Sequence, residues 1–172
     1  MSRLVLAASL VLLLLGCGGS ALSMTEYAES LDLLVSDLGG ELEAMDVQVA
    51  ETPTIEEAQL VLGEALSART EFQESLTELD PPSEVAGIHN DLVDLHARVI
   101  TSQQAFAARA ATATSLDEVL NSSESEAYQA VQIEMSELCP DLQARFDSTA
   151  VFADIPWIGG REVVRVVLGC SP

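Results

Sequence analysis

The sequence predicts an all-α protein: an antiparallel up-down-up-down four-helix bundle with a C-terminal tail tethered to it by a disulfide. Apolar residues recur every three or four positions in four stretches between residues 23 and 150, which is the spacing of one helix face. No stretch before residue 150 alternates with the period of two that a half-buried strand shows. The connections are short, so consecutive helices are expected to pack antiparallel.

The first two helices each begin at a recognisable start signal. Ser23 with Glu26, and Thr54 with Glu57, have the spacing of a capping box, in which side chains and backbone amides satisfy one another. Gly39-Gly40 interrupts the first pattern at a cost of about 1 kcal/mol per Gly relative to Ala and is a candidate kink. The predicted core positions are Tyr27, Leu31, Leu34, Leu38, Leu42, Met45 and Val49 in the first helix, and Ala58, Leu62, Ala65, Phe72, Leu76 and Leu79 in the second.

The third and fourth helices are separated by a polar connection over residues 112–123, with one short turn predicted at 116–120. Ser123 with Glu126 predicts the capping box of the fourth helix. Pro140 lies inside the fourth pattern and predicts a kink or a restart there. The predicted core positions are Val85, Ile88, Leu92, Leu95, Val99 and Phe106 in the third helix, and Tyr128, Val131, Met135, Leu138, Leu142 and Phe146 in the fourth.

The tail, residues 151–172, has a different character. Its segment 161–169 is rich in β-branched residues, which favours a strand, but the chain offers no partner strand. We therefore favour a short helix closed by Gly169, and the strand stays open as the alternative.

Residues 1–16 have the layout of an export signal. Arg3 supplies a positive start, and Leu4 to Leu15 is an uninterrupted run of Leu, Val, Ala and Ser. At about 1.5 Å per residue the run spans roughly 18 Å, well short of the ~30 Å hydrocarbon core of a membrane. The segment therefore predicts a signal peptide rather than a transmembrane helix.

The run ends in Leu14-Leu15-Gly16-Cys17, which resembles the bacterial lipobox. The resemblance implies cleavage before Cys17, a lipid on that cysteine, and a place in the cell envelope on the extracytoplasmic side of a bacterial membrane. Residues 17–22 would then form a tether that reaches at most about 18 Å. The alternative is an ordinary secretory leader cut nearby, with Cys17 an incidental residue.

Export also predicts how Cys139 and Cys170 are used. They are an isolated pair in an oxidising compartment, for which a disulfide is the expected state and two buried thiols the alternative. Closing a loop of about 30 residues would contribute roughly 3 to 4 kcal/mol in the chain-entropy model. The two cysteines lack the paired spacing of a zinc site.

Charge excludes several functions. All seven basic residues are arginine, and removal of the leader with Arg3 leaves six arginines against 28 acidic residues, a net charge of −22. Such a field repels nucleic-acid phosphates and anionic lipid headgroups, so no nucleic-acid partner is expected. The hydrophobic share of 48% supports a packed core rather than a disordered acidic chain.

His89 and His96 are the histidines of the chain and its weak candidates for metal ligation. Seven residues place them on one side of a helix but about 10.5 Å apart along its axis, too far to share one metal ion. We expect each to border the apolar stripe and to bond a carboxylate of a neighbouring helix. No cofactor is predicted; a haem or transition metal held through one histidine is the alternative.

Acidic residues recur every seven positions on the predicted second helix, at Glu57, Glu64, Glu71 and Glu78. We call these four residues the acidic stripe. The expected meaning is a solvated face opposite the core, and weak binding of divalent cations or cationic ligands is the alternative.

The sequence contains no motif for a nucleophile elbow, a phosphate-binding glycine loop or a zinc protease. The expected function is therefore a non-enzymatic, lipid-anchored binding or interaction module that meets an envelope protein or a small ligand. A metal- or haem-carrying bundle and an enzyme of unrecognised type are the alternatives.

Overall fold

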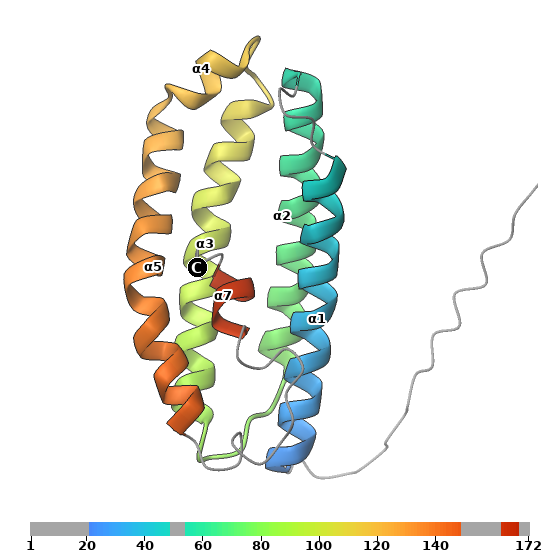
Figure 1. The fold of residues 1–172 in the computed structure, drawn as a ribbon, viewed down its shortest axis with the longest axis vertical. Helices are drawn as coiled ribbons and strands as arrows, with labels where there is room; N and C mark the ends of the chain where they lie inside the picture. The colour runs from blue at the N-terminus through green and yellow to red at the C-terminus, as the bar shows by residue number, and fades with distance from the viewer. Residues whose placement is uncertain (1–20, 49–53, 149–162, 169–172) are drawn as a thin grey trace, which may run out of the picture.

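The regular structure of the chain is helical throughout the parts that the computed structural model describes, residues 21–48, 54–148 and 163–168. Four helices are long: α1 Met24–Gln48, α2 Ile55–Glu78, α3 Ala86–Ala110 and α5 Ser123–Ser148. Two are short: α4 Leu116–Leu120 and α7 Val163–Leu168 (Figure 1). The predicted all-α class is confirmed, and the part of the tail that is described is helix, not strand.

Two of the predicted helix starts are confirmed in detail. Ser23 and Glu26 exchange backbone and side-chain hydrogen bonds, and so do Thr54 and Glu57. The start of α5 differs by one residue. The hydroxyl of Ser122, not Ser123, accepts the backbone N–H of Ser125, so the cap lies one position earlier than the sequence pattern predicted.

Neither of the predicted weak points breaks its helix. α1 is continuous through Gly39 and Gly40, and α5 is continuous through Pro140, so the restart predicted there does not occur. Burial explains the continuity of α5, because Cys139 and Leu142 on either side of Pro140 both pack into the core. A Cβ on Gly39 would lie 3.6 Å from Cγ1 of Val166, an ordinary contact, so α7 lies close against α1 here.

The long helices pack in chain order. α1 packs against α2, α2 against α3, and α3 against α5. α7 contacts α1, α3 and α5, and Figure 1 shows it between the two outer helices. The tail helix therefore fills the space where α1 and α5 face each other.

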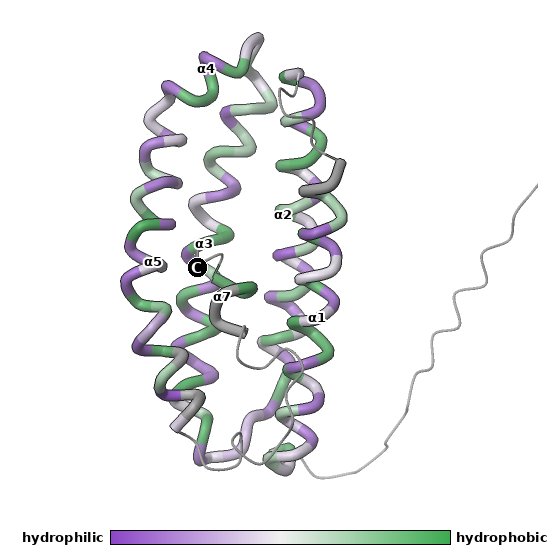
Figure 2. The backbone as a smooth tube through the Cα atoms, viewed as in Figure 1, coloured by the Kyte–Doolittle hydropathy of each residue, from purple (hydrophilic) through white to green (hydrophobic). Residues whose placement is uncertain are grey.

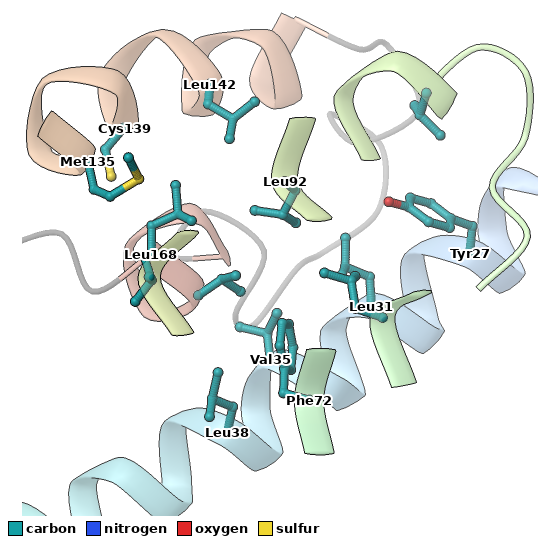
Figure 3. Close-up of a cluster of buried hydrophobic side chains, with 14 of the residues drawn as sticks. Tyr27, Leu31, Val35, Leu38, Phe72, Leu92, Met135, Cys139, Leu142 and Leu168 are labelled. Carbon is teal, nitrogen blue, oxygen red and sulfur yellow. The ribbon is translucent and has the colours of Figure 1, made fainter. Parts of the chain in front are cut away.

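The core follows from the amphipathic pattern of these helices, visible in Figure 2 as hydrophobic and hydrophilic positions that alternate along each one. Side chains from α1, α2, α3, α5 and α7 converge in one cluster (Figure 3). The cluster consists of Tyr27, Ala28, Leu31, Val35, Leu38, Ala68, Phe72, Leu76, Val85, Leu92, Val99, Met135, Cys139, Leu142, Val167 and Leu168. A smaller cluster of Ala110, Ala113 and Val119 seals the end where α4 lies.

The N-terminal segment enters the domain at the opposite end. The backbone N–H of Leu22 donates to the carbonyl oxygen of Asp80 at 2.9 Å, and the Leu22 side chain packs against the core. The last residue of the predicted tether is thus held beside the connection between α2 and α3. Within the described ranges, every helix is too short or too polar to cross a membrane.

The burial pattern predicts that a Leu→Ala substitution lowers the free energy of unfolding by different amounts at a buried and at an exposed position. Leu92→Ala removes a side chain that is 0% exposed and should lower the free energy of unfolding by about 2 to 5 kcal/mol. Leu60→Ala, at a site that is 61% exposed, should change it by less than about 0.5 kcal/mol. Urea unfolding of both variants measures the difference, and equal effects would mean that the helix faces are misplaced.

Candidate functional site

A line of polar side chains runs along the buried face of α3. His89, His96 and Gln103 stand seven residues apart, and they are 4%, 0% and 3% exposed. Seven residues is almost two turns of helix, so the three side chains share one face. Leu92 and Val99, which lie between them on this face, are fully buried, and so is Val85, the residue before α3.

The predicted surroundings of the two histidines are wrong. We expected His89 and His96 at the border of the apolar stripe with carboxylate partners, and both lie inside the core with neutral partners. The apolar residues alone placed the stripe through Ile88 and Leu95, which are only partly buried. The buried positions are instead the next residues, His89 and His96, which are polar and therefore do not appear in a pattern of apolar residues.

His96 is held by a side-chain amide of α2. The Nε2 of Gln73 donates to the carbonyl oxygen of Val93, so its Oε1 faces the ring and accepts from His96 Nδ1 at 2.7 Å. The ring also meets Phe72 edge to face, with centroids 5.0 Å apart. Burial, together with the Arg69 guanidinium, lowers the pKa of His96 from 6.5 to about 3, so the ring is neutral near pH 7.

His89 is held in the same way by α1. Its Nδ1 lies 3.1 Å from the hydroxyl oxygen of Tyr27, and the two rings meet edge to face at 5.7 Å. Burial lowers the pKa of His89 and raises the pKa of Tyr27, which favours the neutral form of both groups.

Arg69 brings a cation into this interior. It is buried on α2, and its Nη1 donates to the carbonyl oxygen of Val167 in α7 at 2.8 Å. Burial is the main cause that lowers the pKa of Arg69 from its ordinary value. The guanidinium thus ties the tail helix to α2 through a buried, charge-assisted hydrogen bond.

Two buried acceptors in this line have no hydrogen-bond partner within the described part of the chain: His96 Nε2 and Gln103 Oε1. With its proton on Nδ1, His96 presents the Nε2 lone pair to the interior, and that is the atom through which a neutral imidazole binds a metal. The described residues hold no group of three His, Cys, Asp or Glu side chains placed to share a metal ion.

Of the three predicted cysteine sites, Cys139 alone lies within the described residues. Cys139 is buried in the core on α5, close to Met135 and Leu168 (Figure 3). Cys17 and Cys170 lie outside the described residues. The predicted lipid and disulfide therefore stay predictions.

The acidic stripe lies on the outer surface of α2. Glu57, Glu64, Glu71 and Glu78 are all exposed. Glu57 belongs to the capping box of α2, whose hydrogen bonds from Thr54 lower the pKa of its carboxyl group. Glu71 accepts a hydrogen bond from Ser67. The geometry is that of a solvated helix face.

A groove of about 480 Å³ lies between α3 and α5. Its apolar surface comes from Leu95, Leu138 and Leu142, of which Leu142 is buried and Leu138 is 36% exposed. Charged side chains line the rest of it: Asp91, Asp94, Arg98, Asp141 and Arg145. The groove thus combines an apolar surface with fixed charges, as binding sites commonly do.

Two ion pairs join α3 to α5 at this groove. Arg98 pairs with Glu134, and Arg145 pairs with Asp91. The pairing lowers the pKa of Glu134 and raises that of Arg98, in each case mainly through the hydrogen bond between them. All four side chains are about half exposed, so the pairs position the two helices more than they stabilise them.

The sequence pattern does not predict this groove. The signals were Asp94 with Arg98 on α3 and Asp141 with Arg145 on α5, each four residues apart. Nothing in one sequence says that these two pairs face each other across neighbouring helices.

Comparison of the chain with protein-family models, with curated proteins and with solved structures finds no match. Its function is therefore argued from its own residues.

Buried His96 predicts a loss of stability in acid. The unfolded chain takes up a proton on His96 below pH 6.5, whereas the folded chain does so only near pH 3. The unfolded state thus binds more protons in this window, and the free energy of unfolding falls with falling pH by at most about 1.4 kcal/mol per pH unit.

The measurement is urea unfolding of the wild type and of His96→Leu at several values between pH 3 and pH 7. The variant should have the shallower pH dependence, because the carboxylates titrate in both proteins and cancel from the comparison. Parallel curves would show that His96 is not the buried neutral base described above.

Proposed function

We propose that the protein is an envelope lipoprotein, anchored through Cys17, whose helical domain is a non-enzymatic binding module. The observation that carries the proposal is the α3–α5 groove, where an open apolar surface lies among fixed charges. The other polar cluster, around His96, is enclosed in the core and faces no solvent. A partner can therefore meet the groove without unfolding the domain.

We infer further that the long helices form one antiparallel up-down-up-down four-helix bundle. The packing of α1 on α2, α2 on α3 and α3 on α5 supports this topology, as do the alternating chain directions visible in Figure 1. The bundle differs from an ideal one because α7 fills the space between α1 and α5.

A Cys139–Cys170 disulfide would hold the tail in that position. Cys139 is buried beside α7, and Leu168, the last residue of α7, precedes Cys170 by two positions. Leu168 and Cys139 belong to the same core cluster, which supports a bridge between Cys139 and the cysteine two residues after Leu168. The bond would fix the tail helix covalently to α5.

The anchor would place a defined end of the domain next to the membrane. Leu22 is held at the connection between α2 and α3, only five residues after Cys17. The groove begins near this end, since Asp91 lies five residues, about 7.5 Å, into α3. The binding surface would thus lie in the membrane-proximal half of the domain.

A metal- or haem-carrying domain is the second candidate, and one observation favours it. His96 has its Nδ1 fixed by Gln73 and its Nε2 without a partner in the described structure, which is how second-shell groups orient a metal-binding histidine. A Soret band, or one equivalent of metal that is lost in His96→Ala, would favour this candidate over the binding module.

The cysteine chemistry is tested on the mature protein unfolded without reductant. It should contain no free thiol, because Cys17 carries a thioether and the other two cysteines are bridged, and reduction should release two thiols. Cys17→Ser should incorporate no radiolabelled fatty acid. Unchanged labelling would contradict the anchor, and free thiols before reduction would contradict the bridge.

The binding function is tested by photocrosslinking in cells that express the full chain. A photoreactive amino acid at Leu138, in the groove, should yield a discrete adduct. The same amino acid at Leu60, which is more exposed but lies on α2 outside the groove, is the control and should yield none. The same result at both positions would contradict a binding function of the groove.

A further inference from the structure

Both arginines of the groove form ion pairs, whereas two of its aspartates form none within the described ranges. The guanidinium of Arg98 bonds Glu134 although Asp94 lies one turn before it, and Arg145 bonds Asp91. Asp94 and Asp141 have no ion-pair partner within the described ranges. Both carboxylates are exposed and line the groove, one on each helix. Once its arginines are paired, the groove thus presents two negative charges beside an apolar surface.

The shape of the groove favours an elongated occupant. Its residues on α3 run from Asp91 to Arg98, and those on α5 from Leu138 to Arg145, so each wall is about two helical turns, or roughly 10.5 Å, long. A small ligand is held by a site that encloses most of its surface, whereas this groove is open. A helix laid along it would present residues spaced by three, four and seven to Leu95, Leu138 and Leu142.

The negative charge of the domain distinguishes among the possible occupants of the groove. A second copy of this chain or an anionic lipid surface would bring further negative charge to a domain whose net charge is already −22, from six arginines and 28 acidic residues. A partner with lysine or arginine beside its apolar residues would instead pair Asp94 and Asp141 and cover the leucines.

We propose that the α3–α5 groove binds a cationic amphipathic helix of another envelope protein, with Asp94 and Asp141 pairing its basic residues. This inference rests on the proposed binding function and names the class of partner. Leu95 and Leu138 supply most of the apolar contact, with the buried Leu142 beneath them, and the two carboxylates select the sign of the charge.

The test uses the lipidated protein in nanodiscs of zwitterionic lipid, with empty nanodiscs as the blank. The probe is a fluorescent synthetic peptide of about 14 residues with leucines spaced by three, four and seven and flanking lysines, and its sibling carries glutamates in place of the lysines. Fluorescence anisotropy should show the lysine peptide binding tighter by on the order of tenfold.

Two double variants separate the groove from the overall negative charge. Asp94→Asn with Asp141→Asn should weaken binding of the lysine peptide by about three- to tenfold. Glu64→Gln with Glu78→Gln on the acidic stripe makes the same change in net charge and should alter it by less than about twofold. Leu138→Gln should also weaken binding, because it removes part of the apolar surface.

Each contrary result has its own meaning. Equal loss in both double variants would show diffuse attraction and overturn the proposal. Equal binding of the two peptides, or no binding while the Leu138 adduct persists in cells, would overturn the cationic partner but leave the binding function standing. Absence of both peptide binding and the adduct would overturn both, and self-association of the purified protein through the groove would replace the partner by a second copy.

Discussion

Buried polar groups need partners, and in this domain that requirement fixes how the helices lie against one another. His89 of α3 meets Tyr27 of α1, His96 of α3 meets Gln73 of α2, and Arg69 of α2 meets the backbone of α7. Apolar stripes alone would allow a helix to slide by one turn at little cost, since leucine packs against leucine in several registers. A slide here would strand a histidine or a guanidinium without its partner in the core, at a cost of about 1 to 3 kcal/mol for a neutral group and more for a charged one. The hydrogen bonds of the two histidines therefore fix the axial register of α3 against α1 and α2, and that of Arg69 fixes α7 against α2.

The groove depends on that register. Its α3 residues Asp94, Leu95 and Arg98 lie on the turns that also carry Leu92, His96 and Val99 into the core. Once the buried face is fixed by its hydrogen bonds, the direction of the outer face follows from helix geometry. α5 is set against it by the two ion pairs and by Leu142, which belongs to both the core and the groove. The same contacts that define the fold thus bring the groove residues together.

Periodicity and capping were enough to predict the helices, because a helix start depends on residues within one turn of each other. Ser23 with Glu26 and Thr54 with Glu57 are local signals of this kind, and both formed as predicted. Apolar residues predicted only part of the buried face of α3. Leu92 and Val99 are buried as predicted, but three of the seven buried residues of the helix are polar: His89, His96 and Gln103. Their seven-residue spacing was the available signal, and it was interpreted through metal geometry rather than through packing. The groove, which joins residues 91–98 of α3 to residues 138–145 of α5, depends on tertiary packing that no local pattern encodes.

Arg69 also helps to explain the position of the tail helix α7. A six-residue helix has little stability of its own, because nucleation of a helix is unfavourable and short helices gain few hydrogen bonds. Val167 and Leu168 bury their side chains completely, and the Val167 carbonyl, one of the last four in a helix and so without an intrahelical donor, accepts from Arg69. The guanidinium gains an acceptor in the core and the helix end gains a donor, so each satisfies a group that would be costly to bury alone.

The acidity that would favour a cationic partner would also affect how far a tethered domain lies from the membrane. An anionic bilayer repels a domain of this charge, but that repulsion decays over a Debye length of about 8 Å in physiological salt. The proposed tether from a lipidated Cys17 to Leu22 would reach up to about 18 Å, which would let the domain stand roughly two Debye lengths from the headgroups with the lipid inserted. At that distance a layer of solvent roughly 16 Å deep, wider than one helix with its side chains, would separate the bilayer from the end of the domain where Leu22 enters. A basic helix that leaves the surface of the same membrane would be attracted to this acidic domain, and the groove would offer it carboxylates beside an apolar surface.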